Sequence, residues 1–213
     1  MIFGPPPFMG SSPATETFLG SAVTSTSATT QTFASMPLGP VAAGRTIAVF
    51  VNGNSGTLRT VSGITVDGVA LSPVVGRSNS LSRLELWIGV VNTANTVGSI
   101  AVTWSGAQSR AVISVYSVAN LQSPTAIATN SSGTSGAAIA AASLAGGVVL
   151  AAAGTNNGGT FTWAGDVTED MDQSTASLVS LSTAGGLTTG TSASATPTAS
   201  SSSQFNSIIA TFR

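Results

Sequence analysis

Apolar and polar residues alternate with a period of two along several short stretches of the chain. The clearest stretch spans residues 81–91, where one face is apolar and the other is mixed: Leu84, Leu86, Ile88 and Val90 against Arg83, Glu85, Trp87 and Gly89. A β-strand points successive side chains to opposite faces, so this pattern predicts a half-buried strand. The same period in Ile100, Val102 and Trp104 predicts that Trp104 lies in the core, whereas Trp87 is expected on an outer face.

Short strands separated by turn residues are predicted along most of the chain. Asp67 and Gly68 stand between two apolar runs and favour a type I′ hairpin, whose two central residues need positive φ. Helix-forming residues are sparse, while Val, Ile and Thr, which favour strands, are frequent. Further strands are expected at residues 45–51, 99–105, 110–118, 137–144, 148–153, 160–163, 177–183 and 206–212.

These strands predict an all-β fold, an antiparallel β-sandwich of jelly-roll type. No fixed-period repeat is visible, which disfavours a solenoid or a propeller. Residues 14–213 are expected to form one sandwich domain. The last strand, near the C-terminus, is expected to return into a sheet, so its removal should unfold the domain.

Residues 1–13 differ from the rest of the chain and predict an extended N-terminal arm. The three consecutive prolines favour a polyproline II conformation and interrupt the apolar run that a secretory signal needs. Two interpretations stay open: a disordered tail, or an arm that docks onto a partner at low entropic cost. The expected docking residues are Phe3, Pro5, Pro6, Pro7, Phe8 and Met9.

The composition removes most kinds of catalytic chemistry. The chain has no His and no Cys, and its six cationic residues are all Arg. A Ser-His-Asp triad, a thiol nucleophile, a Schiff-base lysine and a P-loop are therefore excluded, and we expect neither an enzyme nor a bound cofactor. The net charge is −1 and the arginines are scattered, which argues against nucleic-acid binding.

No apolar stretch predicts a membrane helix, which needs about 18 apolar residues. The longest candidate, residues 136–154, is interrupted by Gly146 and Gly147 and is expected to form two strands. A nearly uncharged surface promotes association between copies, so we expect a homo-oligomer.

One acidic segment, GDVTEDMD, carries Asp166, Glu169, Asp170 and Asp172. Three interpretations stay open for it. A glycosidase needs two carboxyl groups about 5 to 9.5 Å apart across a sugar, an arrangement that neighbours on one loop seldom adopt. A calcium loop suits carboxylate oxygens, although the spacing is not that of an EF-hand. The third interpretation is a solvated acidic loop without a ligand.

Trp87 and Trp163 are the candidate surface contacts of the predicted sandwich. Trp87 is expected on the outer face of its strand and Trp163 lies near a predicted loop. An outward-facing indole ring suits a sugar, a second sheet or a neighbouring subunit. A surface glycan and a second copy of the chain therefore both stay open as partners.

The segment Leu84–Leu121, with its strands LELWIGVV, SIAVTWSG and RAVISVY, resembles a module of tailed-phage and prophage virion proteins. The later segments GGVVLAAAG, FTW and ATFR resemble further parts of that module, and the likeness covers about residues 15–213. The resemblance implies a non-enzymatic jelly-roll or related β-sandwich component of a head, fibre or tail. It implies assembly with other virion proteins, by analogy as a trimer.

A virion protein would be made in the host cytoplasm and released by lysis, which agrees with the expected lack of a secretory signal. The alternative function is a carbohydrate-binding module used in adsorption to a host. That function needs an exposed aromatic platform, whereas a structural role needs only buried or interfacial aromatic residues.

Overall fold

A computed structural model describes residues 12–175, 179–201 and 203–213. In these ranges all regular structure is β-strand, and seventeen strands form four antiparallel sheets. The predicted all-β class and antiparallel β-sandwich are confirmed. None of the described residues belongs to a helix with the length and apolarity for a membrane span.

The first half of the chain forms two sheets. A five-stranded sheet with the order β1-β9-β3-β7-β6, the first inner sheet, packs on a four-stranded sheet with the order β2-β8-β4-β5, the first outer sheet. The strands are β1 (Thr15–Thr24), β2 (Ala28–Pro37), β3 (Thr46–Asn54), β4 (Val61–Val66), β5 (Val69–Ala70), β6 (Ser72–Asn79), β7 (Ser82–Val90), β8 (Val97–Gln108) and β9 (Arg110–Ala119).

The second half forms two more sheets. The second inner sheet has the order β10-β17-β12-β15-β14, and the second outer sheet has the order β11-β16-β13. The strands are β10 (Ala128–Ser132), β11 (Ile139–Ala142), β12 (Gly147–Thr155), β13 (Phe161–Gly165), β14 (Thr168–Thr175), β15 (Val179–Thr188), β16 (Ser192–Ala199) and β17 (Asn206–Phe212).

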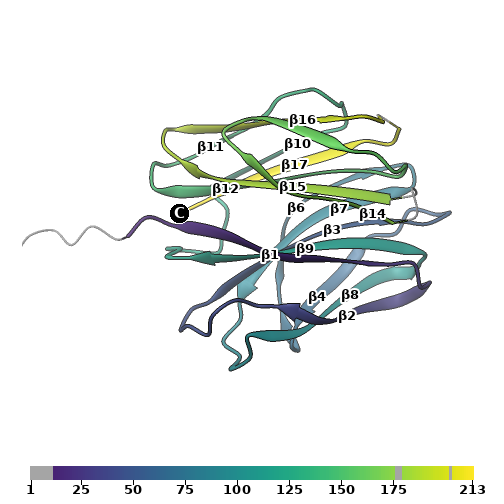
Figure 1. Cartoon of the computed structure of the whole chain (residues 1–213), viewed down its shortest axis with the longest axis horizontal. Coiled ribbons are helices and arrows are strands. Elements are labelled where there is room, and N and C mark those ends of the chain that lie inside the picture. The colour runs from purple at the N-terminus through teal and green to yellow at the C-terminus, as the bar shows by residue number, and fades with distance from the viewer. Residues whose placement is uncertain (1–11, 176–178, 202) are drawn as a thin grey trace, which may run out of the picture.

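The four sheets stack in the order first outer, first inner, second inner, second outer. Figure 1 shows the N-terminal half below and the C-terminal half above, with the inner sheets meeting in the middle. A central core, to which Phe50, Tyr116, Leu150 and Phe212 belong, lies between the two inner sheets. Separate apolar cores lie between each inner sheet and its outer sheet.

The central strands of the inner sheets, such as β3 and β12, are buried on both faces, which explains why they read as nearly continuous apolar runs. In β3, Ala48 and Phe50 point into the central core, while Val49 and Val51 point towards the first outer sheet. Every residue of β3 and of β12 is buried. Period-two alternation in these strands therefore separates two cores and does not separate core from solvent.

The strand order of the first half recurs in the second half. In the first half β1 pairs with β9, β2 with β8, and β3 with β7; in the second half β10 pairs with β17, β11 with β16, and β12 with β15. These pairs are nested: the first strand of each half pairs with the last, the second with the last but one, and so on inwards. No fixed-period repeat is visible in the sequence, so this internal repeat appears only in the strand pairing.

Two local predictions are confirmed. Asp67 and Gly68 have φ values of 47° and 80° and connect β4 to β5 as a hairpin turn. The C-terminal strand β17 returns into the second inner sheet, where it pairs with β10 on one side and β12 on the other. The chain end is therefore fixed in the interior of a sheet.

Candidate functional site

The six predicted docking residues of the arm, Phe3, Pro5, Pro6, Pro7, Phe8 and Met9, lie outside the described residues. The described chain begins at Ser12, and the next two residues are held by the body. The carbonyl oxygen of Pro13 accepts a hydrogen bond of 3.1 Å from Asn120 Nδ2, and the buried Ala14 donates its N–H to the Gly146 oxygen at 2.9 Å. The start of β1 therefore fixes the point where the arm leaves the sandwich, at the end where the C-terminus also lies (Figure 1).

Trp87 is buried, with an exposed fraction of 6%, and the expectation that it lies on an outer surface is wrong. The alternation correctly separates Trp87 from Leu86 and Ile88, which point into the central core. The other face of β7, however, is covered by the first outer sheet. The indole N–H of Trp87 donates to Glu85 Oε2 at 2.7 Å, so its polar atom is also used inside the protein.

Trp163 on β13 is half-buried, and it is the other aromatic residue proposed for surface contact. Its indole N–H donates to Ser182 Oγ at 2.8 Å, and its ring packs beside Phe161 and Phe205. Trp104, predicted to be in the core, is buried, and its N–H donates to Gln31 Oε1 at 3.0 Å. The three tryptophans thus belong to packed cores and form no shared platform.

The acidic segment forms a strand, and the expectation of a loop is wrong for most of it. Glu169, Asp170 and Asp172 lie on β14, an edge strand, and Asp166 lies in the turn before it. Each carboxylate accepts hydrogen bonds from a different neighbour: Asp166 from Ser194 N at 2.8 Å, Glu169 from Ser182 Oγ at 3.2 Å, Asp170 from Tyr116 Oη at 2.9 Å and Asp172 from Phe161 N at 2.8 Å. The described residues contain no group of three Asp, Glu, His or Cys side chains placed to hold a metal ion.

Asp170 belongs to a polar cluster that joins the two inner sheets, together with Glu16 on β1, Tyr116 on β9 and Thr183 on β15. The Tyr116 hydroxyl lies 2.9 Å from Asp170 Oδ2 and 2.8 Å from Thr183 Oγ1. The Glu16 carboxyl lies over Gly185, where a Cβ atom would come within 2.7 Å of Glu16 Cδ. A side chain at position 185 would therefore displace Glu16.

The cluster shifts the pKa values of its acids. Burial, and next the charge of Asp170, raise the pKa of Glu16 to about 7. Burial also raises the pKa of Asp170, against the opposing effect of the hydrogen bond from Tyr116. Burial is likewise the main reason that the pKa of Tyr116 is raised. Glu16 therefore exchanges a proton near neutral pH, which no pattern in the sequence indicated, because β1 and β14 are about 150 residues apart along the chain.

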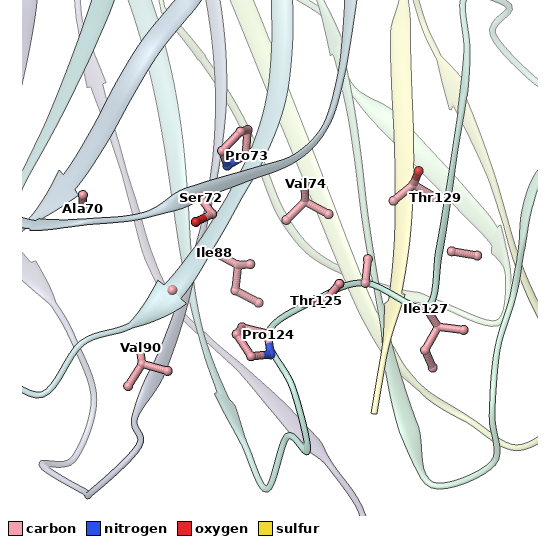
Figure 2. A pocket seen from close by; sticks show the side chains of 13 residues that line it. Ala70, Ser72, Pro73, Val74, Ile88, Val90, Pro124, Thr125, Ile127 and Thr129 are labelled. Atoms are coloured by element: carbon pink, nitrogen blue, oxygen red, sulfur yellow. The ribbon is translucent and has the colours of Figure 1, made fainter.

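The second site is a groove between the two halves, at the side where β6 and β10 form the edges of the inner sheets. This β6/β10 groove encloses about 550 Å³, within the range of small-ligand sites. Figure 2 shows Val74 and Ile88 from the first half and Pro124 and Ile127 from the second half among its lining side chains. None of its lining residues is charged.

The walls of the groove combine solvent-exposed apolar side chains with strand edges that have no pairing partner among the described strands. Val90 and Ile127 each keep an exposed fraction of 39%, although both are large aliphatic residues. Among the described strands, β6 and β10 each pair on one side only. A β-bulge between Pro73 and Val75 adds Val74 to the groove wall, and bulges commonly redirect a side chain at binding sites. This arrangement suits an uncharged, apolar or extended ligand.

Comparison with known proteins gives no relative for this chain: no family model, no curated protein and no solved structure matches it. The site is therefore interpreted from its own geometry. The groove escaped sequence reasoning because its two walls come from segments about 50 residues apart, neither of which carries a motif.

Proposed function

We propose that the chain is a non-enzymatic structural component of a phage virion, a head decoration, fibre or tail protein. The observation that carries this proposal is the nested strand pairing, in which β1, β2, β3 and β4 pair in turn with β9, β8, β7 and β5. This pairing supports the jelly-roll type, an architecture that viral capsid proteins use widely. The support for the proposal is therefore the analogy between folds, and a fold alone does not assign an activity.

The distribution of polar chemistry supports a structural role. The carboxylates of β14 are each bonded to a separate neighbour, and the side chains of Arg45 and Arg83 likewise bond to groups within the body. Arg45, for example, is buried and donates to the carbonyl oxygens of Gly39, Val91, Thr93 and Asn95. Such groups hold strands and loops in place, as a rigid virion subunit requires.

In this proposal residues 1–13 dock the subunit onto the head or tail, and the sandwich surfaces assemble copies, as a trimer by analogy. The subunit is made in the host cytoplasm and leaves by lysis. Trp87 cannot serve the glycan-binding alternative, because its ring is buried. Trp163, which is only half-buried, is the residue on which that alternative depends.

Under this proposal the gene belongs to a phage or prophage, so the experiment is to purify phage particles from a lysate of the host cells and to search their protein by mass spectrometry. The proposal expects the chain to sediment with the particles at a fixed ratio to the major capsid protein. A variant lacking residues 1–13 should fold but stay in the soluble fraction. Recovery of the full-length chain only in the soluble fraction would contradict the virion assignment, and incorporation of the shortened chain would contradict the docking role of the arm.

Light scattering on the purified chain measures its oligomeric state, and a monomer would contradict the homo-oligomer in solution. A glycan array on the same protein addresses the alternative function. Binding that is abolished by Trp163→Ala, in a variant that still folds, would favour adsorption over a purely structural role.

A further inference from the structure

We infer that the β6/β10 groove is the binding site of the chain's own N-terminal arm, residues 1–11. This inference goes beyond the proposed function and does not depend on it, because it concerns the free protein in solution. It rests on three features: the chemistry of the groove, the place where the arm leaves the body, and the length and composition of the arm.

The groove offers apolar contacts without any charge to be matched. Its lining combines the exposed Val90 and Ile127 with two prolines, Pro73 and Pro124, and backbone of two edge strands. Residues 1–11 carry no charged side chain, and they include Phe3, Phe8 and Met9. Burial of such side chains against Val90 and Ile127 removes apolar surface from water on both partners.

The arm leaves the body close to the groove. Asn120 Nδ2 binds the carbonyl oxygen of Pro13, and the chain from Asn120 reaches Pro124, the first groove residue of the second half, after four residues. Four residues span at most about 14 Å. Eleven residues of polyproline II span about 34 Å, so the arm is long enough to reach the groove and lie along it.

The three consecutive prolines reduce the conformational entropy that the arm loses when it binds. Their φ angles are already restricted, so less conformational freedom is lost on binding than for an ordinary segment. A proline can accept a hydrogen bond through its carbonyl oxygen but has no N–H to donate. A volume of about 550 Å³ holds a few residues of the arm rather than its whole length, and Phe8 and Met9 suit this space.

The arm of the same molecule is favoured over that of another copy by its tether. A short flexible tether gives an effective concentration in the millimolar range, far above the micromolar concentration of other copies in dilute solution. In the free chain, the apolar residues of the arm are thus covered by the groove until a partner takes them up.

Disulfide trapping tests this inference, and the chain is suited to it because it contains no native cysteine. The test protein is the full chain with Phe8→Cys and Ile127→Cys, oxidised at low micromolar concentration. The matched control combines Phe8→Cys with Leu144→Cys. Leu144 is a large aliphatic residue with an exposed fraction of 46%, against 39% for Ile127, and it lies two residues before Gly146, which binds Ala14 at the arm's exit.

An arm held in the groove should form the disulfide between positions 8 and 127 within one molecule at least about tenfold faster than the control pair, because a disulfide needs Cα atoms within about 7 Å. A freely moving arm would react with position 144 as fast or faster, and this result would overturn the inference. A disulfide between two molecules as the main product would overturn it too, in favour of a second copy as the source of the arm.

A charge in the groove provides a second readout. Val90→Asp should slow the trapping at position 127 to the rate of the control pair. Val41→Asp, at an exposed valine outside the groove, should leave the trapping rate unchanged. Equal rates with and without Val90→Asp, in variants whose thermal unfolding shows an intact fold, would overturn the groove as the binding site.

Discussion

Glu16 links the stability of the protein to pH. Its folded-state pKa of about 7 lies above its ordinary value of 4.5, so the folded chain keeps a proton that the unfolded chain releases between these two pH values. Stability from this group is therefore fully present below about pH 4.5 and is lost as the pH rises through 7. Burial is the main cause of the raised pKa, and the charge of Asp170 on β14 adds to this effect.

We predict that Glu16→Gln raises the melting temperature at pH 8 and leaves it nearly unchanged at pH 4.5, because glutamine stays neutral at both. Thermal unfolding followed by circular dichroism across this range measures the difference. Glu169→Gln is the comparison variant. Burial also raises the pKa of this carboxyl, but its residue is exposed and the hydrogen bond from Ser182 opposes the rise, so we expect a smaller change in melting temperature. A loss of stability with Glu16→Gln that is equal at every pH would show that the carboxylate itself makes a favourable contact.

Trp87 and Trp163 should respond very differently to truncation. Trp87→Ala creates a large cavity in the core between the first inner and first outer sheets and leaves the buried Glu85 without its indole donor. We expect a loss of about 3–5 kcal/mol in the free energy of unfolding, against about 1–2 kcal/mol for the half-buried Trp163→Ala. Urea unfolding measures both. Similar losses for the two variants would contradict the burial of Trp87.

At the scale of strands, the pattern of apolar residues predicted some strands from the sequence and failed to indicate others. The β-branched residues of β3 and β9 and the alternation of apolar residues in β7 identified these strands, and Asp67-Gly68 identified the turn between β4 and β5. The strands β1, β2, β10, β14 and β16 were missed. In β16, SASATPTA, the buried face is made of Ala193, Ala195 and Pro197, whose small apolar side chains give little contrast against Ser and Thr.

The acidic strand β14 shows a second limit of sequence reasoning. Only Met171 and Thr175 are buried among its described residues, so its sequence TEDMDQST resembles a loop. The strand forms because β15 supplies a paired edge, and a register shift between Glu169 and Met171 turns Asp170 towards Tyr116. Both the strand and the cluster around Glu16 depend on contacts between segments distant along the chain, which local patterns do not report.

The C-terminal strand β17 should be indispensable for folding. It lies between β10 and β12, and Ile208, Ala210 and Phe212 fill the central core while Ile209 faces the second outer sheet. We predict that a chain ending at residue 205 is unfolded or insoluble. Removal of Arg213 alone, which lies after the strand, should leave the fold intact. Circular dichroism and solubility report the result, and a cooperative melt of the chain ending at 205 would contradict it.

The whole molecule is two sandwiches of the same strand order joined through one shared core. The repeat is invisible in the sequence because the fold fixes which positions are buried and leaves their identity open. In β3, TIAVFVNGN, the central core receives Ala48 and Phe50, whereas the corresponding strand β12, GVVLAAAGT, contributes Val148, Leu150 and Ala152. Equivalent strands thus satisfy the same burial pattern with side chains of different size.

The shared core makes the two halves dependent on each other. We predict that the full chain unfolds in urea as one cooperative transition, and that residues 12–120 and 121–213 produced separately do not fold stably. Each isolated half exposes an apolar face, with Phe50 and Tyr116 on the first and Leu150 and Phe212 on the second. Co-expression should restore the fold by reuniting the core. Two separate transitions in the full chain, or a cooperative melt of either half alone, would show that the sandwiches are independent domains, contrary to the single domain expected for residues 14–213.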